Sequence, residues 1–168
     1  MTSRVEFVEL PVAAIHALAD GDLHAASAEV GMKLTSFVEA ERWFWQIRSD
    51  QLRKSPQDAE WIARLAVVDG VIVGRGGFHG APNEEGVVEV GYSVDPPYRR
   101  RGHARAILGA LLDRARQDPR VSRVRASIRP DNAASLATIA GYGFAQIGEQ
   151  WDEEDGLEII YERDVIRE

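Results

Sequence analysis

The hydrophobic period of the chain changes abruptly near Gly102, and this change constrains the fold more than any other feature. From Val87 to Val94, apolar residues alternate with polar or small ones, which is the period-two pattern of a strand with two different faces. After Gly102, apolar residues recur every three to four positions as far as Ala115, which is typical of an amphipathic helix. A strand that leads through a short turn into such a helix indicates an α/β architecture.

Further strands and helices are predicted around this unit. Asp69-Gly70 joins two strand-like runs, Trp61 to Val68 and Val71 to Phe78, and Asp-Gly is a strong β-hairpin signal. The order of the elements predicts a mixed sheet with helices on its faces. The other expected elements are a strand over residues 5–10, a helix opened by Pro11, a helix begun by a capping box at Ser36 and Glu39, a strand over residues 124–128, a short helix capped by Asp131, and two strands around the acidic turn at residues 151–156.

The composition is that of an ordinary globular protein. With 168 residues, 45% of them hydrophobic, and no linker, we expect a single domain over residues 1–168. The formal net charge of −7 argues against nucleic acid as a partner. The first ten residues lack the apolar stretch of a signal peptide or membrane span, so we expect a cytoplasmic protein without a membrane partner.

The residue types also disfavour metal and thiol chemistry. The chain has no cysteine, which removes disulfides, thiolate nucleophiles and cysteine-based zinc sites. His16, His24, His79 and His103 show no paired spacing on one helix, so we expect no metal. His79, at the end of a predicted strand, is within reach of an active-site gap, although such histidines are more often structural.

The segment Arg99-Arg100-Arg101-Gly102-His103-Ala104 lies between the end of a strand and the start of a helix. At such a junction several backbone N–H groups lack an intrahelical partner, and the helix dipole favours an anion. Gly102 lets the backbone approach the anion, and the arginines add charge-assisted contacts. A pyrophosphate is the natural ligand, whereas the alternative for this segment taken alone is a solvated basic turn.

Two blocks of the sequence resemble the GNAT superfamily of N-acetyltransferases. Residues 99–104, with the preceding run Glu89-Val-Gly-Tyr-Ser-Val-Asp-Pro, resemble its Arg/Gln-x-x-Gly-x-Gly/Ala motif. Asn132-x-x-Ser135 followed by Gly143-Phe144 resembles the distal motif of the branch that includes ribosomal-protein acetyltransferases. The match runs from about Trp61 to Tyr161.

The resemblance implies the GNAT fold, a mixed and mostly antiparallel seven-stranded sheet flanked by about four helices. Residues 1–60 would form the acceptor side and residues 61–165 the CoA-binding core. Acetyl-CoA would be the co-substrate, held in a V-shaped gap where the strand of Glu89 splays from the one near Val124. The acceptor would be a primary amine of a small molecule or of a peptide N-terminus, and a homodimer is common in such proteins. The cofactor contacts implied are Tyr92, Val94, Arg99, Arg100, Arg101, Gly102, His103, Ala104, Arg105 and Asn132.

Acyl transfer to an amine needs a deprotonated acceptor, a polarised thioester carbonyl and a protonated leaving thiolate. Glu89 lies on the opposite face of its strand from Val88 and Val90, and it is our candidate general base, directly or through water. The alternative is an ordinary carboxylate on a solvated face, or one paired with an arginine. By the resemblance, a backbone N–H near Val94 would polarise the carbonyl.

The group that protonates the thiolate is less well marked. Many GNAT enzymes carry a tyrosine seven residues after the Asn132 position, but this chain has Ile139 there. Ser135 is our candidate catalytic replacement, with Tyr142 in reserve, and the alternative for Ser135 is a hydrogen bond to the helix backbone. This departure keeps open a second function, a GNAT-fold module that binds acyl-CoA without efficient turnover.

Two further features bear on the acceptor. Trp43, Phe44 and Trp45 are consecutive on a predicted helix and cannot all face one core, so at least one is exposed or lines a pocket. The acidic turn at residues 152–155 is either a solvated hairpin tip or an attractor for a cationic amine. Neither feature identifies the acceptor, because one fold serves many substrates.

Overall fold

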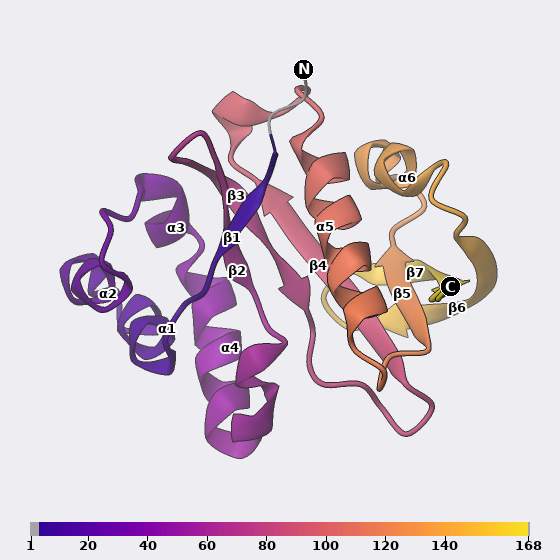
Figure 1. Cartoon of the computed structure of the whole chain (residues 1–168), viewed down its shortest axis with the longest axis horizontal. Coiled ribbons are helices and arrows are strands. Elements are labelled where there is room, and N and C mark those ends of the chain that lie inside the picture. Colours follow the sequence, from indigo (N-terminus) through magenta and orange to yellow (C-terminus); the bar gives the residue numbers. More distant parts are fainter. Residues whose placement is uncertain (1–3, 168) are drawn as a thin grey trace.

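Seven strands form the mixed sheet that organises the molecule (Figure 1). The computed structural model describes residues 4–167. The strand order is β1-β2-β3-β4-β5-β7-β6, and every neighbouring pair is antiparallel except β4 and β5, which run parallel. The predicted seven-stranded, mostly antiparallel sheet is thus confirmed. The strands are β1 (Glu6–Val8), β2 (Arg64–Val68), β3 (Val71–Phe78), β4 (Val87–Val94), β5 (Arg123–Ile128), β6 (Ala145–Asp152) and β7 (Gly156–Asp164).

Residues 4–167 contain six α-helices, where about four were expected. Two short 3-10 turns, η1 (Pro56–Glu60) and η2 (Pro96–Tyr98), accompany them. None of the helices in the described part of the chain is long and apolar enough to cross a membrane. The α-helices are α1 (Val12–Ala19), α2 (Leu23–Val30), α3 (Ser36–Ala40), α4 (Arg42–Lys54), α5 (His103–Gln117) and α6 (Ala133–Ile139).

The extra helices come from the N-terminal third of the chain. α2 was not predicted, because it buries only Ala26 and so carries almost no apolar stripe. The single helix expected from Ser36 is broken at Glu41 into α3 and α4. Glu41 makes a paired contact with Arg75 of β3, with both N–O distances at 3.0 Å, so the break coincides with a tie to the sheet.

Two predicted helix caps were wrong. Ser36 is the first residue of α3, and its N-cap is Thr35, whose side chain makes no capping hydrogen bond. α6 is capped by Asn132 rather than Asp131, because the Asn132 side chain accepts a hydrogen bond from the Ser135 N–H at 3.0 Å. The Asn132 amide that the family motif carries is therefore used in part to start a helix.

The sheet has a separate apolar core on each face. In β2, Leu65 and Val67 pack with α1 to α4, whereas Ala66 and Val68 pack with α5. In Figure 1, α1 to α4 lie together to the left of the sheet, and α5 crosses in front of β3 and β4. The two faces of β4 therefore meet different surroundings.

The parallel pair in the middle of the sheet opens along its length. Residues 87–89 of β4 pair with residues 123–125 of β5, and the ladder ends there. Beyond this point β4 continues beside β3 as far as Val94, while β5 continues beside β7 as far as Ile128. A gap thus opens in the sheet immediately after Glu89, as the resemblance implied.

Candidate active site

A basic groove lies where β4 ends and α5 begins. Its volume is about 570 Å³, and one wall is the exposed side of α6. Eight of the ten predicted cofactor contacts line it, whereas Arg101 and Asn132 do not. The lining residues are Tyr92, Ser93, Val94, Tyr98, Arg99, Arg100, Gly102, His103, Ala104, Arg105, Ala134, Ser135, Ala137 and Thr138.

The turn before α5 presents main-chain donors to this groove. Gly102 is the N-cap of α5 with φ +83°, and the backbone N–H groups of His103, Ala104 and Arg105 have no backbone acceptor among residues 4–167. A Cβ built on Gly102 would have no atom within 4 Å, so the space above the turn is open. Free N–H groups at the start of a 15-residue helix, under open space, fit a phosphate group.

The arginines of the turn differ in what they already bind. Arg99 Nε donates to the Val94 carbonyl at 2.9 Å, and Arg105 Nη1 donates to the Ala140 carbonyl at the end of α6 at 2.7 Å. Arg100 lines the groove with φ +62°, a left-handed backbone that costs a residue with a Cβ about 1–2 kcal/mol. Such a conformation is concentrated at functional turns.

A second hollow, the carboxylate pocket, opens on the α4 side of the sheet. Its volume is about 820 Å³. Trp43, which is 55% exposed, lines it together with the buried Phe44, as expected for the consecutive aromatic residues of α4. Other parts of the lining come from the end of β3, from Glu89 and its neighbours on β4, from β5, and from the hairpin between β6 and β7.

Glu89 faces this pocket and is paired with His79. The Glu89 Oε2 atom lies 3.0 Å from His79 Nδ1, and the carboxylate side chain is only 24% exposed. Burial would raise the pKa of the Glu89 carboxyl, but the hydrogen bond and charge of His79, with the charge of Arg125 and a hydrogen bond from Ser127, hold that pKa below its usual value. The carboxylate is therefore ionised near neutral pH.

The walls of the pocket carry charges of both signs. Arg48 lines it, donates from Nη1 to Gln51 at 2.7 Å, and has a pKa lowered by burial and by the neighbouring Arg75. The opposite rim is acidic and holds Trp151, which is 75% exposed. The acidic residues of this rim are Asp152, Glu153, Glu154, Asp155 and Glu158.

The two hollows meet at two residues. Tyr92 and Ser135 line both the basic groove and the carboxylate pocket. Burial raises the pKa of the Tyr92 hydroxyl more than hydrogen bonding with Ser135 and Thr138 lowers it, so this hydroxyl keeps its proton at neutral pH. A group that bridges the hollows would have two hydroxyls beside it.

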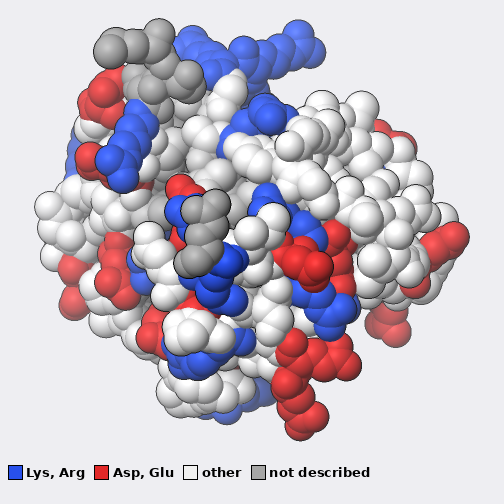
Figure 2. Space-filling model, turned by 45° about the vertical axis from the view of Figure 1, so that its right-hand side comes forward, with Lys and Arg blue, Asp and Glu red and all other residues white. Residues whose placement is uncertain are grey.

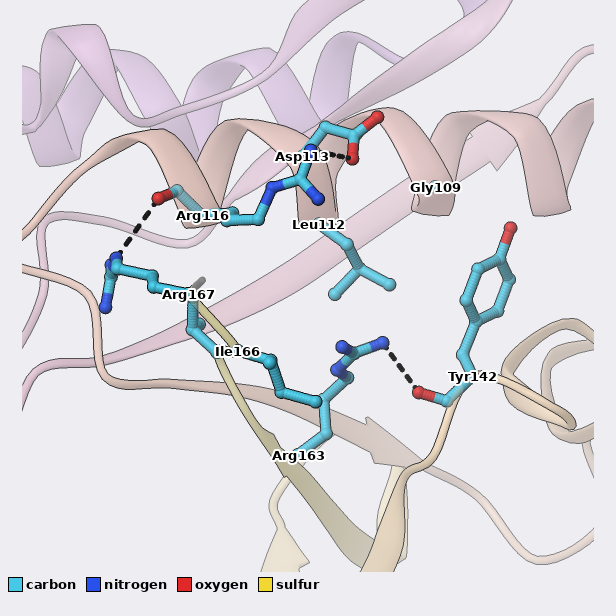
Figure 3. A pocket seen from close by; sticks show the side chains of 9 residues that line it. Gly109, Leu112, Asp113, Arg116, Tyr142, Arg163, Ile166 and Arg167 are labelled. Carbon is cyan, nitrogen blue, oxygen red and sulfur yellow. Dashed lines mark hydrogen bonds and ion pairs between the residues drawn. The ribbon is translucent and has the colours of Figure 1, made fainter.

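A third hollow lies between α5 and the C-terminal segment, away from the sheet gap (Figure 3). There Arg163 donates to the Tyr142 carbonyl at 2.7 Å, and Arg167 donates to the Arg116 carbonyl at 3.1 Å. The Tyr142 hydroxyl donates to the Arg105 carbonyl at 2.8 Å. Tyr142 thus points toward α5 and lines this hollow rather than the other two, so the structure does not support it as the reserve thiolate donor.

The surface charge is mixed. The face in Figure 2 carries a group of basic side chains at its upper edge and acidic side chains on its left, right and lower parts, with further basic side chains between them. A small anion and a cationic group could each find a complementary region on such a surface.

The basic groove offers free N–H groups and arginines, and it joins the carboxylate pocket at the gap in the sheet. Such a site can hold a phosphate-bearing donor beside a nucleophile and pass a group from one to the other. The chain belongs to the acetyltransferase (GNAT) domain family, because the family model matches residues 12–145. This membership makes it an acetyl-CoA-dependent N-acetyltransferase.

Individual relatives agree with this assignment. The uncharacterized N-acetyltransferase YjdG of Bacillus subtilis (strain 168) is 28% identical over 149 residues, which are 85% of this chain and 87% of YjdG. The structure of RimL, a ribosomal L7/L12 alpha-N-protein acetyltransferase, in complex with coenzyme A superposes with a TM-score of 0.67 at 18% identity, covering 98% of this chain and 96% of RimL. Mycobacterium smegmatis RimJ in complex with CoA-disulfide gives 0.64 at 18% identity, covering 95% and 86%. The two structural likenesses show the fold.

Several lining residues were not singled out from the sequence. Arg48 and Arg75, at the carboxylate pocket, and Tyr98, at the groove, carry no motif. The signal that could have indicated the pairing of His79 with Glu89 is the register between strands β3 and β4. Phe78 pairs with Val90, and the next positions along these two antiparallel strands are His79 and Glu89.

Proposed function

We propose that this enzyme transfers the acetyl group of acetyl-CoA to a primary amine of a small molecule or of a peptide N-terminus by direct attack. The observation that carries the proposal is the junction at Tyr92 and Ser135, where a groove suited to phosphates meets a pocket with an ionised carboxylate. Both substrates can occupy the site at once, one in each hollow.

The basic groove is the proposed site of acetyl-CoA. The N–H groups of residues 103–105 and the Arg100 side chain would hold the phosphates, and the open edge of β4 up to Val94 would lie beside the pantetheine arm. Arg99, Arg101, Arg105 and Asn132 stay predicted contacts, although part of the bonding capacity of three of them is used within the chain. When bound, acetyl-CoA supplies an activated thioester.

The carboxylate pocket is the proposed site of the amine. Glu89 and its partner His79 are the proposed centre of proton acceptance there, because the ionised Glu89 carboxylate faces the pocket and lies 3.0 Å from the His79 ring. The acidic rim at residues 152–155 would attract the ammonium form of the acceptor before it loses its proton. Residues 1–60 contribute α4 to this pocket, in keeping with their predicted acceptor-side role.

Protonation of the leaving thiolate is assigned to Ser135. Its position at the junction supports this role, and the protonated Tyr92 hydroxyl lies beside it. Ile139, at the position where many relatives have a tyrosine, is buried and offers no proton. This substitution is the observation in favour of the second candidate, an acyl-CoA-binding module without efficient turnover.

A screen of amines separates the two candidates. The purified chain is incubated with acetyl-CoA and polyamines, aminoglycosides, amino acids or peptides, and both free CoA and the acetylated product are measured. Catalysis predicts stoichiometric product with at least one acceptor, at a rate that falls in a Ser135→Ala variant. Tight acetyl-CoA binding with no product from any class would support the binding module instead. The cytoplasmic location, the single-domain organisation and a homodimer stay predictions from the sequence.

A further inference from the structure

His79 is held rigidly opposite Glu89 at the mouth of the carboxylate pocket. His79 directly follows β3, and its backbone N–H donates to the Glu89 carbonyl at 2.8 Å. Its own carbonyl accepts a hydrogen bond from the Gln51 side chain of α4 at 2.7 Å. The same Gln51 amide donates to Asp58 at 2.9 Å, so the main chain of His79 is fixed from two sides.

The imidazole ring has one occupied and one free nitrogen. Nδ1 lies 3.0 Å from Glu89 Oε2. Nε2 has no hydrogen-bond partner among the described residues, and the side chain is 47% exposed where it lines the pocket. The ring occupies space left by Gly91, since a Cβ at Gly91 would lie 3.0 Å from Nε2. A larger residue at position 91 would push the ring aside.

We propose that His79, through Nε2, is the general base that removes the proton from the acceptor amine, and that Glu89 is a positioning residue that orients the ring and stabilises its protonated form. This inference rests on the proposed function and refines the role of Glu89 within it. Nothing in the sequence motif around Glu89 assigns this role to His79.

With this assignment, every proton that leaves the acceptor nitrogen has a destination. The acceptor ammonium loses one proton to His79 Nε2, and the resulting imidazolium faces the Glu89 carboxylate across Nδ1. The free amine attacks the thioester carbonyl carbon, so a C–N bond forms and the C–S bond breaks. The second proton on the nitrogen passes to the leaving thiolate, by way of Ser135 or water, and gives CoA thiol. His79 then releases its proton to solvent.

The chemistry of the pair favours imidazole over carboxylate as the base. An ordinary imidazole exchanges its proton near pH 6.5, whereas an ordinary carboxyl does so about two pH units lower. Because the pKa of Glu89 is held below its usual value, the carboxylate is a still weaker base. A base that exchanges its proton near neutral pH contributes most to the rate.

Other charged groups surround the pocket that the His79 ring lines. Arg48 on α4 and Arg75 on β3 bring positive charge to the pocket that the ring lines, and the carboxylates around the pocket bring negative charge. The surrounding charged groups are Arg48, Asp58, Arg75, Arg125, Asp152, Glu153, Glu154, Asp155 and Glu158. All of them are left in place by the variants below, so they act equally on wild type and variants.

The test compares kcat/KM across pH for wild type, His79→Gln and Glu89→Gln, with His24→Gln on the exposed surface of α2 as the control. Two acceptors are used, an alkyl amine from the screen and hydroxylamine, which is largely unprotonated near neutral pH. We expect His79→Gln to lose about 10²- to 10⁴-fold with the alkyl amine and to lose the ascending limb near neutral pH. Its loss with hydroxylamine should be at least tenfold smaller, because that acceptor needs no deprotonation.

Glu89→Gln should keep an ascending limb while kcat/KM falls, because the His79 ring loses the carboxylate that orients it. Acetyl-CoA affinity and thermal unfolding of each variant are measured to show that it is folded. The inference is overturned if His79→Gln retains the wild-type pH profile, if Glu89→Gln alone removes the limb, or if both acceptors are lost equally. Wild type that acetylates no amine would instead overturn the proposed function itself, before any variant is compared.

Discussion

The basic groove and the carboxylate pocket meet at Tyr92 and Ser135 but are built in different ways. The groove comes largely from one continuous stretch, residues 92–105, with one side of α6 opposite, and its proposed phosphate contacts are main-chain N–H groups at a helix start. The pocket is assembled from side chains on α4, β3, β4, β5 and the β6–β7 hairpin. A site made of main-chain groups suits a donor that all members of a family share. A site made of side chains suits the choice of acceptor, because each side chain can change without altering the fold.

The largest effect expected on the groove alone comes from Gly102→Val. A Cβ at this position has no protein atom within 4 Å, so the added side chain enters the space proposed for the donor, and we expect acetyl-CoA affinity to fall about tenfold to hundredfold. This corresponds to losing one charge-assisted hydrogen bond, worth about 1.5–3 kcal/mol. Isothermal titration with acetyl-CoA measures it.

Gly31→Val is the matched control for that prediction. Gly31 ends α2 with φ +79° and likewise has no atom within 4 Å of a built Cβ. Both variants should lose a similar unfolding free energy, about 1–2 kcal/mol, because a β-branched residue is forced into the left-handed region. Unchanged acetyl-CoA binding in Gly102→Val would remove the turn from the donor site.

The contrast between the two hollows also explains what the sequence could predict. The groove was predictable because its period change, its glycine and its arginines are adjacent in the chain, and eight of its ten predicted residues line it. Arg101 was included only by adjacency, and its side chain instead lies over Tyr98, with the guanidinium 5.8 Å from the ring centroid. A local sequence pattern can therefore predict where a site made of main-chain groups lies, but it does not predict in which direction each side chain points.

The pocket was largely hidden for the opposite reason. Its residues are spread from Trp43 to Glu158, and they come together only through the sheet order and the packing of α4. The pairing of Arg75 with Glu41 depends on a helix break that no local signal marked. Glu89 was singled out from its place in the family-like run and from its strand face opposite Val88 and Val90, and its partner His79 was noted without an assigned role.

Arg100→Gly should separate backbone strain from anion binding in the groove. Relief of the left-handed backbone should leave the unfolding free energy unchanged or raise it by up to about 1 kcal/mol. Loss of the guanidinium should weaken acetyl-CoA about threefold to tenfold, and more at low salt than at high salt. Denaturant unfolding and titration at two ionic strengths measure the two effects.

Asp69→Gly provides the comparison. Asp69 is the other non-glycine residue with positive φ in the described chain, at +50°, and it lies in the β2–β3 turn outside both hollows. This variant should show a similar small change in stability with acetyl-CoA affinity unchanged. If Arg100→Gly bound acetyl-CoA as tightly as Asp69→Gly does, Arg100 would have no part in the donor site.

The smallest effect is expected at the rim of the carboxylate pocket. In the double variant Glu153→Gln with Glu154→Gln, kcat/KM for a polyamine should fall about twofold to fivefold at low salt and recover at high salt, while the KM for acetyl-CoA stays the same. Asp152 is left intact because its carboxylate accepts the Glu154 and Asp155 N–H groups at 2.8 Å and shapes the turn. Steady-state kinetics at two salt concentrations measure the effect.

Glu29→Gln with Glu39→Gln removes the same charge from exposed positions on α2 and α3, outside both hollows. An equal loss in this control would assign the effect to net charge rather than to the rim. A salt-independent loss in the rim variant would point to direct contact with the acceptor instead of attraction at a distance.

The central claim is that donor and acceptor occupy separate hollows at the same time and react directly where these meet. Initial rates measured against both acetyl-CoA and the amine test it most directly. Simultaneous occupancy predicts intersecting lines in double-reciprocal plots and no acetylated protein when acetyl-CoA is added alone. Parallel lines, with an acetyl group found on the protein before the amine is added, would contradict the account.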